Sequence, residues 1–271
     1  VNIITFNDSF HGRSLGMISA AGGDKLTKGF GPMLPGFIHL PVGDHDALHA
    51  AVDNRTAAIL VEPIQGEGGI IPIPDQCLKG LRDLCDKNGV LLIFDEIQCG
   101  VGRTGKLFAH EWAGIEPDIM AVAKGIGGGF PLGACLATED AAIGMVAGTH
   151  GSTYGGNPMA CAVGGAVMDI VADDTFLNGV GRTAALFRQK LEGLVACHPD
   201  VFEKVRGLGL MIGIKCKVKN IDMVLAGYDA GVLVVPGGDN VIRLLPPLNM
   251  SDEEVGQAVE MLDTAATALE T

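Results

Sequence analysis

Two short apolar runs, each followed by a charged residue, constrain the fold of this chain more than any other feature. Residues 90–94 lead into Asp95, and residues 118–123 lead into Lys124. Each run is bounded by turn residues, which is typical of a buried strand in a parallel sheet. Open α/β sheets form their ligand sites at the carboxyl ends of such strands. We therefore expect Asp95 and Lys124 to lie at one site.

The rest of the N-terminal part repeats the strand and helix pattern. Further strand-like runs occupy residues 1–6, 57–62 and 133–138. Residues 75–87 have helical spacing of their apolar positions, and Gly89 follows as a stop signal. This order predicts an α/β fold with a mainly parallel sheet.

The C-terminal third has a different pattern. Two helices are expected at residues 157–171 and 177–196, then short strands at 208–215, 232–235 and 241–245 with a helix at 221–228 between them. The last helix begins with Ser251 and Glu254, a capping box, and continues with an apolar stripe. We predict a large domain at residues 1–172 and a smaller α+β domain at 173–271.

Composition excludes several classes of protein. The formal net charge of −13 argues against a nucleic-acid partner, although local basic residues can still form a pocket. Seven cysteines without CxxC spacing predict neither a disulfide framework nor a zinc site, and the histidines lack metal-ligand spacing. No stretch is apolar and long enough to cross a membrane. We expect reduced thiols and a cytoplasmic location.

An acid and a lysine at one edge of a parallel sheet suit a pyridine cofactor held as a Schiff base. The lysine forms the imine, and the acid keeps the ring nitrogen protonated. For either residue alone, a helix cap or a solvated surface charge is the simpler interpretation.

Five motifs in a single order make the pattern specific. They are SFHGR at 9–13, EPIQGEGG at 62–69, FDEIQCGVGRTG at 94–105, AKG at 123–125 and GSTYGGNP at 151–158. This series resembles the class III pyridoxal-phosphate aminotransferases, which have the aspartate aminotransferase-like fold (fold type I). The first motif is similar to the acetylornithine and ornithine branch.

The resemblance implies roles around pyridoxal 5'-phosphate. It implies that Lys124 forms the Schiff base and carries the proton, while Asp95 pairs with the pyridine nitrogen. The remaining cofactor contacts that it implies are Phe10 and Ile97 on the two ring faces, Gln98 on the phenolic oxygen, His11, and Thr153 on the phosphate of the neighbouring subunit.

The same resemblance implies how substrates are held. Arg13 would hold the α-carboxylate, and Ser152 would lie near the substrate. Glu67 and Arg243 would form a salt bridge that opens when a second carboxylate binds. A fixed structural bridge, a surface ion pair of Arg13 and helix capping by Ser152 and Thr153 are the competing interpretations. The resemblance also implies a homodimer with shared active sites.

The implied activity is exchange of the terminal amine of N-acetylornithine with 2-oxoglutarate in arginine biosynthesis. Ornithine, succinylornithine and 4-aminobutyrate are alternative donors, and a related aminomutase or an inactive fragment are alternative interpretations. The family carries a Ser-Gly-x-Glu-Ala phosphate loop upstream of the Phe-His motif, and this chain has none. We therefore expect the chain to be incomplete at its N-terminus and to bind the cofactor weakly when alone.

Overall fold

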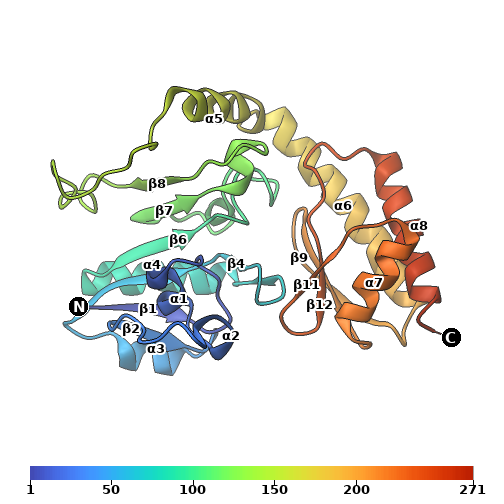
Figure 1. The fold of residues 1–271 in the computed structure, drawn as a ribbon, viewed down its shortest axis with the longest axis horizontal. Helices are drawn as coiled ribbons and strands as arrows, with labels where there is room; N and C mark the ends of the chain where they lie inside the picture. The colour runs from blue at the N-terminus through green and yellow to red at the C-terminus, as the bar shows by residue number, and fades with distance from the viewer. Residues whose placement is uncertain (271) are drawn as a thin grey trace.

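The computed structural model describes residues 1–270, and its N-terminal half is built on a six-stranded sheet (Figure 1). All its neighbouring strands pair in parallel except β7 and β8. In spatial order the strands are β2 (Phe37–Leu40), β1 (Asn2–Phe6), β3 (Thr56–Val61), β6 (Leu91–Asp95), β7 (Ile119–Val122) and β8 (Ala134–Ala137). The predicted α/β fold with a mainly parallel sheet is confirmed.

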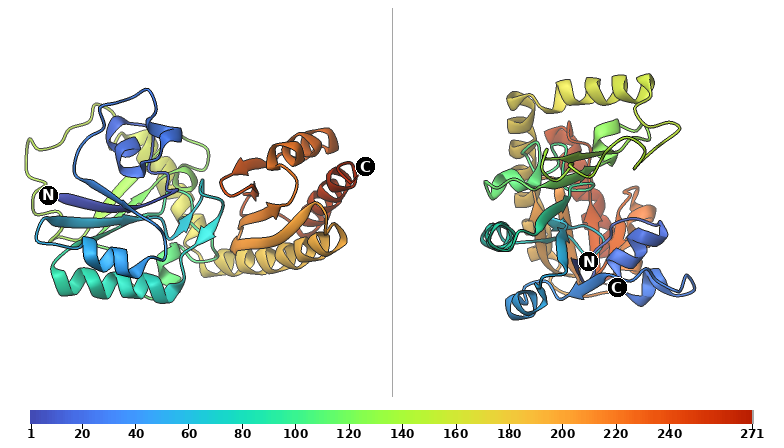
Figure 2. Two further views of the ribbon diagram at one scale, coloured as in Figure 1. Left: turned by 90° about the horizontal axis from the view of Figure 1, so that it is seen from below. Right: turned by 90° about the vertical axis from the view of Figure 1, so that its left-hand side faces the viewer.

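Helices cover both faces of this sheet (Figure 2). α3 (His45–Ala51) and α4 (Asp75–Asn88) lie on one face, and α1 (Leu15–Ala21) and α2 (Asp24–Thr27) lie on the other. The apolar stripe of α4 is buried, as its spacing predicts: Leu78, Leu81 and Cys85 face the core. Gly89 ends the helix with φ +64°, a left-handed conformation that glycine adopts without steric cost.

The strand register brings the carboxyl ends of the central strands together. Val61 of β3 pairs with Phe94 of β6, and Asp95 pairs with Ala121 of β7. The residues that follow these strands therefore meet at one edge. The short hairpin of β4 (Ile64–Gln65) and β5 (Ile71–Pro72) leaves the same edge.

Two helices connect this sheet to a second one (Figure 1). α5 (Pro158–Val171) is capped by Asn157, and α6 (Asp174–Cys197) is capped by Asp173; each cap accepts a backbone N–H of the first turn. α6 runs the length of the C-terminal part, and its buried side chains include Val180, Phe187 and Leu191.

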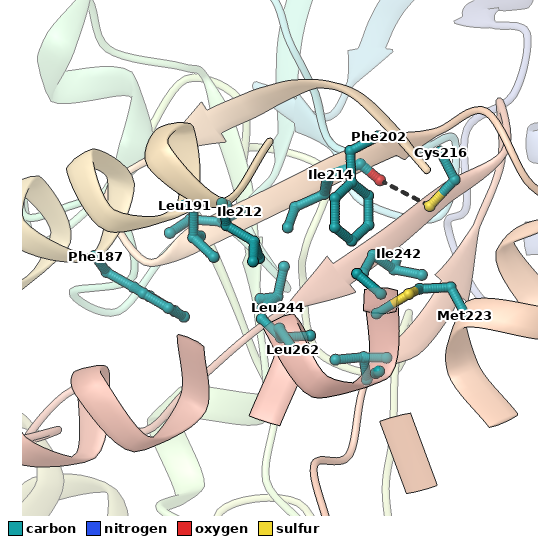
Figure 3. Close-up of a cluster of buried hydrophobic side chains, with 14 of the residues drawn as sticks. Phe187, Leu191, Phe202, Ile212, Ile214, Cys216, Met223, Ile242, Leu244 and Leu262 are labelled. Atoms are coloured by element: carbon teal, nitrogen blue, oxygen red, sulfur yellow. Dashed lines mark hydrogen bonds between the residues drawn. The ribbon is translucent and has the colours of Figure 1, made fainter. Parts of the chain in front are cut away.

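The second sheet is antiparallel and has four strands. Their spatial order is β11 (Val235–Gly237), β12 (Val241–Leu244), β10 (Met211–Cys216) and β9 (Phe202–Leu208). α6, α7 (Asn220–Ala230) and α8 (Asp252–Thr267) pack against it around one apolar core, part of which is shown in Figure 3. The capping box predicted at Ser251 and Glu254 is present at the start of α8.

Two sequence predictions in this part are wrong in detail. Residues 208–215 are not one strand: β9 and β10 form a hairpin whose turn contains Gly209, with φ +59°. β9 is an edge strand that contains three charged residues and a glycine among its seven positions, so its apolar signal is weak. The strand expected at 232–235 begins at Val235 and carries Pro236, which is tolerated because β11 is also an edge strand.

The two largest cores lie on either side of the predicted domain boundary. The buried side chains of one core come from positions between 4 and 113, and those of the other come from positions between 180 and 266. A smaller cluster joins Val101, Met120 and Val122 to Val171 and Leu177. The division at residue 172 stays a prediction. Among residues 1–270, no helix is long and apolar enough to span a membrane.

Candidate active site

Asp95 is buried at the end of β6, where it is held by two hydrogen bonds. Only 6% of the residue is exposed to solvent. Oδ2 lies 2.9 Å from Nδ1 of His11, and Oδ1 accepts the backbone N–H of Ile97 at 3.1 Å. His11 follows β1, two strands away, so the parallel sheet joins residues 84 positions apart. The carboxyl group is thereby oriented before any ligand binds.

Lys124 follows β7 and begins a short 3-10 turn, Lys124–Gly127. Its φ of +48° lies in the left-handed region, which is uncommon for a non-glycine residue and concentrates at functional sites. Among residues 1–270, no side chain or carbonyl bonds its amino group. Desolvation lowers the pKa of Lys124; nearby Glu67, Asp95 and Glu62 oppose this shift, and Arg243 adds to it. The amine is therefore unpaired and more readily neutral than a free lysine.

A cavity of about 650 Å³, lined by Lys124, lies between the two sheets. Gln98 and Gly125 line it from the first sheet, and Arg243 and Leu245 line it from the second. This volume suits a small cofactor together with a substrate.

Glu67 and Arg243 form a two-pronged ion pair across this cavity. Nη1 of Arg243 donates to Oε1 of Glu67 at 2.7 Å, and Nη2 donates to Oε2 at 3.1 Å. Nε2 of Gln98 also donates to Oε1 of Glu67, at 3.3 Å. The pair joins positions 176 residues apart, and its arginine lies on β12 of the second sheet. In this structure the bridge is closed.

Phe10 and Arg13 lie in the segment that carries His11, and Ile97 lies in the segment that follows Asp95. Phe10 and Ile97 are both half-buried, and Ile97 directly follows the Asp95 corner. The guanidinium carbon of Arg13 lies 5.2 Å from the centre of the Phe10 ring, a cation–π contact. Arg13 is exposed and has no carboxylate partner in residues 1–270. Its charge is therefore free to bind an anion.

Ser152 and Thr153 lie apart from the other candidates. Both are exposed in the loop between β8 and α5, and neither lines the cavity. The Ser152 hydroxyl accepts the N–H of Gly155 at 2.9 Å. Within one chain, the structure does not bring these hydroxyls to Lys124.

Comparison with known proteins decides the family. The family model described as "Aminotransferase class-III" matches residues 1–266. This chain belongs to the class III aminotransferases. The acetylornithine aminotransferase of Rhodobacter capsulatus is 62% identical over 269 residues, which are 99% of this chain and 68% of that protein. The Mesorhizobium japonicum protein of the same name is 56% identical over 98% of this chain and 67% of its own length.

Solved structures agree with the fold of this class III aminotransferase. The ornithine aminotransferase of Toxoplasma gondii, whose active site is described with partially occupied PLP, has a TM-score of 0.94 at 34% identity. The match covers 100% of this chain and 65% of the Toxoplasma gondii chain. The N-acetylornithine aminotransferase of Stenotrophomonas maltophilia gives a TM-score of 0.83 at 34% identity, over 99% of this chain and 66% of its own. The chain thus spans about two thirds of the length of its relatives.

The residues of this aminotransferase fit the family's cofactor, pyridoxal phosphate, at its ring end. Three buried polar atoms in the site have no protein partner in residues 1–270: Nε2 of His11, Oε1 of Gln98 and Nε of Arg243. An unpartnered acceptor such as Oε1 suits a ring hydroxyl, the buried Asp95 suits a protonated ring nitrogen, and the unpaired Lys124 amine suits an aldehyde. Among residues 1–270, no cluster of three or more His, Cys, Asp or Glu side chains could hold a metal ion, and all seven cysteines are free.

Sequence reasoning alone gave no specific role to two further candidates, Glu62 and Arg103. Glu62 is buried and accepts backbone N–H groups from the segments that carry Phe10 and Glu67. Arg103 lines the cavity, and burial lowers its pKa to about 10; its guanidinium donates to the carbonyls of Pro246 and Leu210. Both residues lie inside the quoted motifs, but only their long-range partners reveal what they hold.

Proposed function

We propose that this protein exchanges the terminal amine of N-acetylornithine with the keto group of 2-oxoglutarate, in arginine biosynthesis. The observation that carries the proposal is a single cavity that holds an unpaired Lys124 amine and a closed Glu67–Arg243 bridge. The relative from Rhodobacter capsulatus, named acetylornithine aminotransferase, supports this choice of donor.

In the proposed mechanism, pyridoxal phosphate supplies, when bound, a ring that withdraws electrons from the substrate α-carbon. The buried carboxylate of Asp95, whose two oxygens are oriented by His11 and by the Ile97 N–H, would hold the ring nitrogen. Lys124 would hold the cofactor through its Nζ, and the same amine would move the proton of the substrate carbon.

Arg13 and Arg243 would divide the recognition of substrate carboxylates. Arg13 has no anionic partner in residues 1–270 and would bind the α-carboxylate that both substrates share. With the bridge closed, Glu67 neutralises Arg243, which suits the uncharged acetylated end of the donor. With 2-oxoglutarate the bridge would open, and Arg243 would bind the second carboxylate.

Ser152 and Thr153 require a second chain in this proposal. Their loop is exposed and carries apolar side chains, among them Ile143 (81% exposed), Met145 and Tyr154. We propose a homodimer in which Thr153 of each subunit binds the cofactor phosphate at its partner's site. Free thiols at all seven cysteines are consistent with the cytoplasm as the proposed location.

A second candidate function is ornithine aminotransfer. It is favoured by the high structural similarity to the Toxoplasma gondii ornithine aminotransferase. The 34% identity to that protein is far below the 62% to the Rhodobacter capsulatus relative, so we rank it second.

A panel of amino donors tests the proposal. The purified protein is supplied with pyridoxal phosphate and 2-oxoglutarate, and glutamate formation is measured with N-acetylornithine, succinylornithine, ornithine and 4-aminobutyrate. We expect the highest kcat/KM with N-acetylornithine. Preference for free ornithine would select the second candidate, and turnover without 2-oxoglutarate would indicate an aminomutase.

A further inference from the structure

Glu62 is a buried carboxylate that joins two segments of the active site. It directly follows β3, and only 4% of the residue is exposed. Oε1 accepts the backbone N–H of Phe10 at 2.8 Å, and Oε2 accepts the backbone N–H of Gly66 at 3.1 Å. One segment carries Phe10, and the other leads directly into Glu67. Each oxygen therefore holds a different part of the site.

Gln65 adds a second connection between the same segments. Its Nε2 donates to the carbonyl of Asn7 at 2.9 Å, and the residue is 1% exposed. The segment after β1 is thus held at Asn7 and again at Phe10. The Glu-Pro-Ile-Gln motif has a physical purpose here: its acid and its amide align the two segments.

The position of Gly66 also determines the position of the ion pair. Gly66 lies so close to Gln98 that an added Cβ would come within 2.3 Å of Oε1 of that side chain. Gln98 in turn donates to Glu67, the partner of Arg243. A shift of Gly66 would therefore displace Gln98 and loosen the contact that orients the bridge.

We propose that Glu62 is a positioning residue whose ionisation couples the geometry of the substrate site to pH. The inference rests on the proposed aminotransferase function. Ionised, the carboxylate accepts both backbone N–H groups. Protonated, one oxygen becomes a donor, so one of the two segments loses its charge-assisted hydrogen bond.

Electrostatics place this change close to neutral pH. Burial raises the pKa of Glu62 to about 7; the charge of His11 and the two backbone donors oppose the shift, and Asp95 adds to it. Cys99 and Lys124 also interact electrostatically with Glu62.

Glu62→Gln tests the proposal, because the amide keeps the volume but cannot ionise. Only its Oε1 can accept, so one backbone N–H is lost at every pH. We expect kcat/KM for both substrates to fall about tenfold at about pH 8, the loss of one charge-assisted hydrogen bond, and to match the wild type below about pH 6. If the ratio of the variant's kcat/KM to that of the wild type did not change with pH, the proposal would be overturned.

Thermal unfolding provides a reading that needs no cofactor. Folding raises the pKa of Glu62. The contribution of Glu62 to the free energy of unfolding is therefore greatest below the pKa of the unfolded chain, and it is lost as the pH rises through about 7. The melting temperature of Glu62→Gln, relative to that of the wild type, should therefore rise as the pH is increased from about 5 to about 8. A constant difference would overturn the proposal even if the donor panel found no transamination.

Two further variants act as controls. Asp118→Asn also removes a carboxylate that accepts a backbone N–H, from Leu92 at 2.7 Å, but at the opposite end of the strands. It should leave the pH dependence of kcat/KM unchanged. Glu62→Asp keeps an ionisable group, but its side chain is too short to reach both segments. Its kcat/KM should therefore stay below that of the wild type at about pH 8. It should still decrease further as the pH falls, because the carboxylate is still protonated.

Discussion

At the scale of single residues, Lys124 combines an unpaired amine with a pKa lowered by desolvation. We expect Lys124→Ala to reduce transamination by at least about 10²–10⁴-fold, because it removes the proton carrier as well as the covalent attachment. Lys124→Arg is the matched control: it keeps the charge, but its guanidinium stays protonated and should be equally inactive. Single-turnover absorbance with the amino donor measures both. Near-normal rates in either variant would contradict the assignment.

The Glu67–Arg243 bridge allows a second residue-scale prediction. Arg243→Ala should weaken the half-reaction with 2-oxoglutarate by about 1.5–3 kcal/mol, the value of a hydrogen bond to a charged group, and affect the donor half-reaction less. Arg13→Ala should weaken both half-reactions, since both substrates carry an α-carboxylate. The two half-reactions are followed separately by stopped-flow absorbance. Equal losses for Arg243→Ala would favour a fixed structural bridge.

At the scale of elements, His198 fastens the end of α6 to α8. Its Nε2 and Nδ1 each lie 2.9 Å from a carboxylate oxygen, of Asp263 and Glu270 respectively. Both nitrogens can donate only when the ring is protonated. Burial opposes protonation, but these hydrogen bonds outweigh it and raise the pKa of His198.

This arrangement predicts how the attachment of α8 depends on pH. A raised pKa means that the contribution is complete below the unfolded value and is lost as pH rises through the folded one. His198→Gln should cost about 1 kcal/mol at about pH 6, a modest value because Asp263 is largely exposed, and less at about pH 9. Melting temperatures of both proteins across this range test it. A difference that grows with pH would contradict the prediction.

At the scale of the whole molecule, the proposed homodimer predicts complementation. Lys124→Ala and Thr153→Ala should each impair activity, the first in its own site and the second in its partner's. Hybrid dimers would contain one intact site, so random mixing should restore about a quarter of wild-type activity if the interface is twofold symmetric. Activity is measured after co-expression of differently tagged chains. Recovery no greater than the average of the two variants would indicate that Thr153 does not act across subunits.

The sequence by itself determined the local features of this protein. The short apolar runs before Asp95 and Lys124 predicted buried strands, and the caps and apolar spacing predicted α4 and α8, because these features depend on neighbours within a few turns. The ordered motifs identified the family, which the class III model confirms. The edge strand β9 escaped detection because Glu203, Lys204 and Arg206 interrupt its apolar residues.

Only the tertiary structure decided the contacts by which distant residues meet. Pairing of His11 with Asp95 depends on strand register, and the Glu67–Arg243 contact depends on how the two sheets pack. Glu62 is part of a motif, yet its purpose emerges only from its bonds to Phe10 and Gly66. Its pKa also depends on burial, which no local pattern measures. Long-range contacts and desolvation are properties of the packed chain, and for that reason they could not be read from sequence spacing.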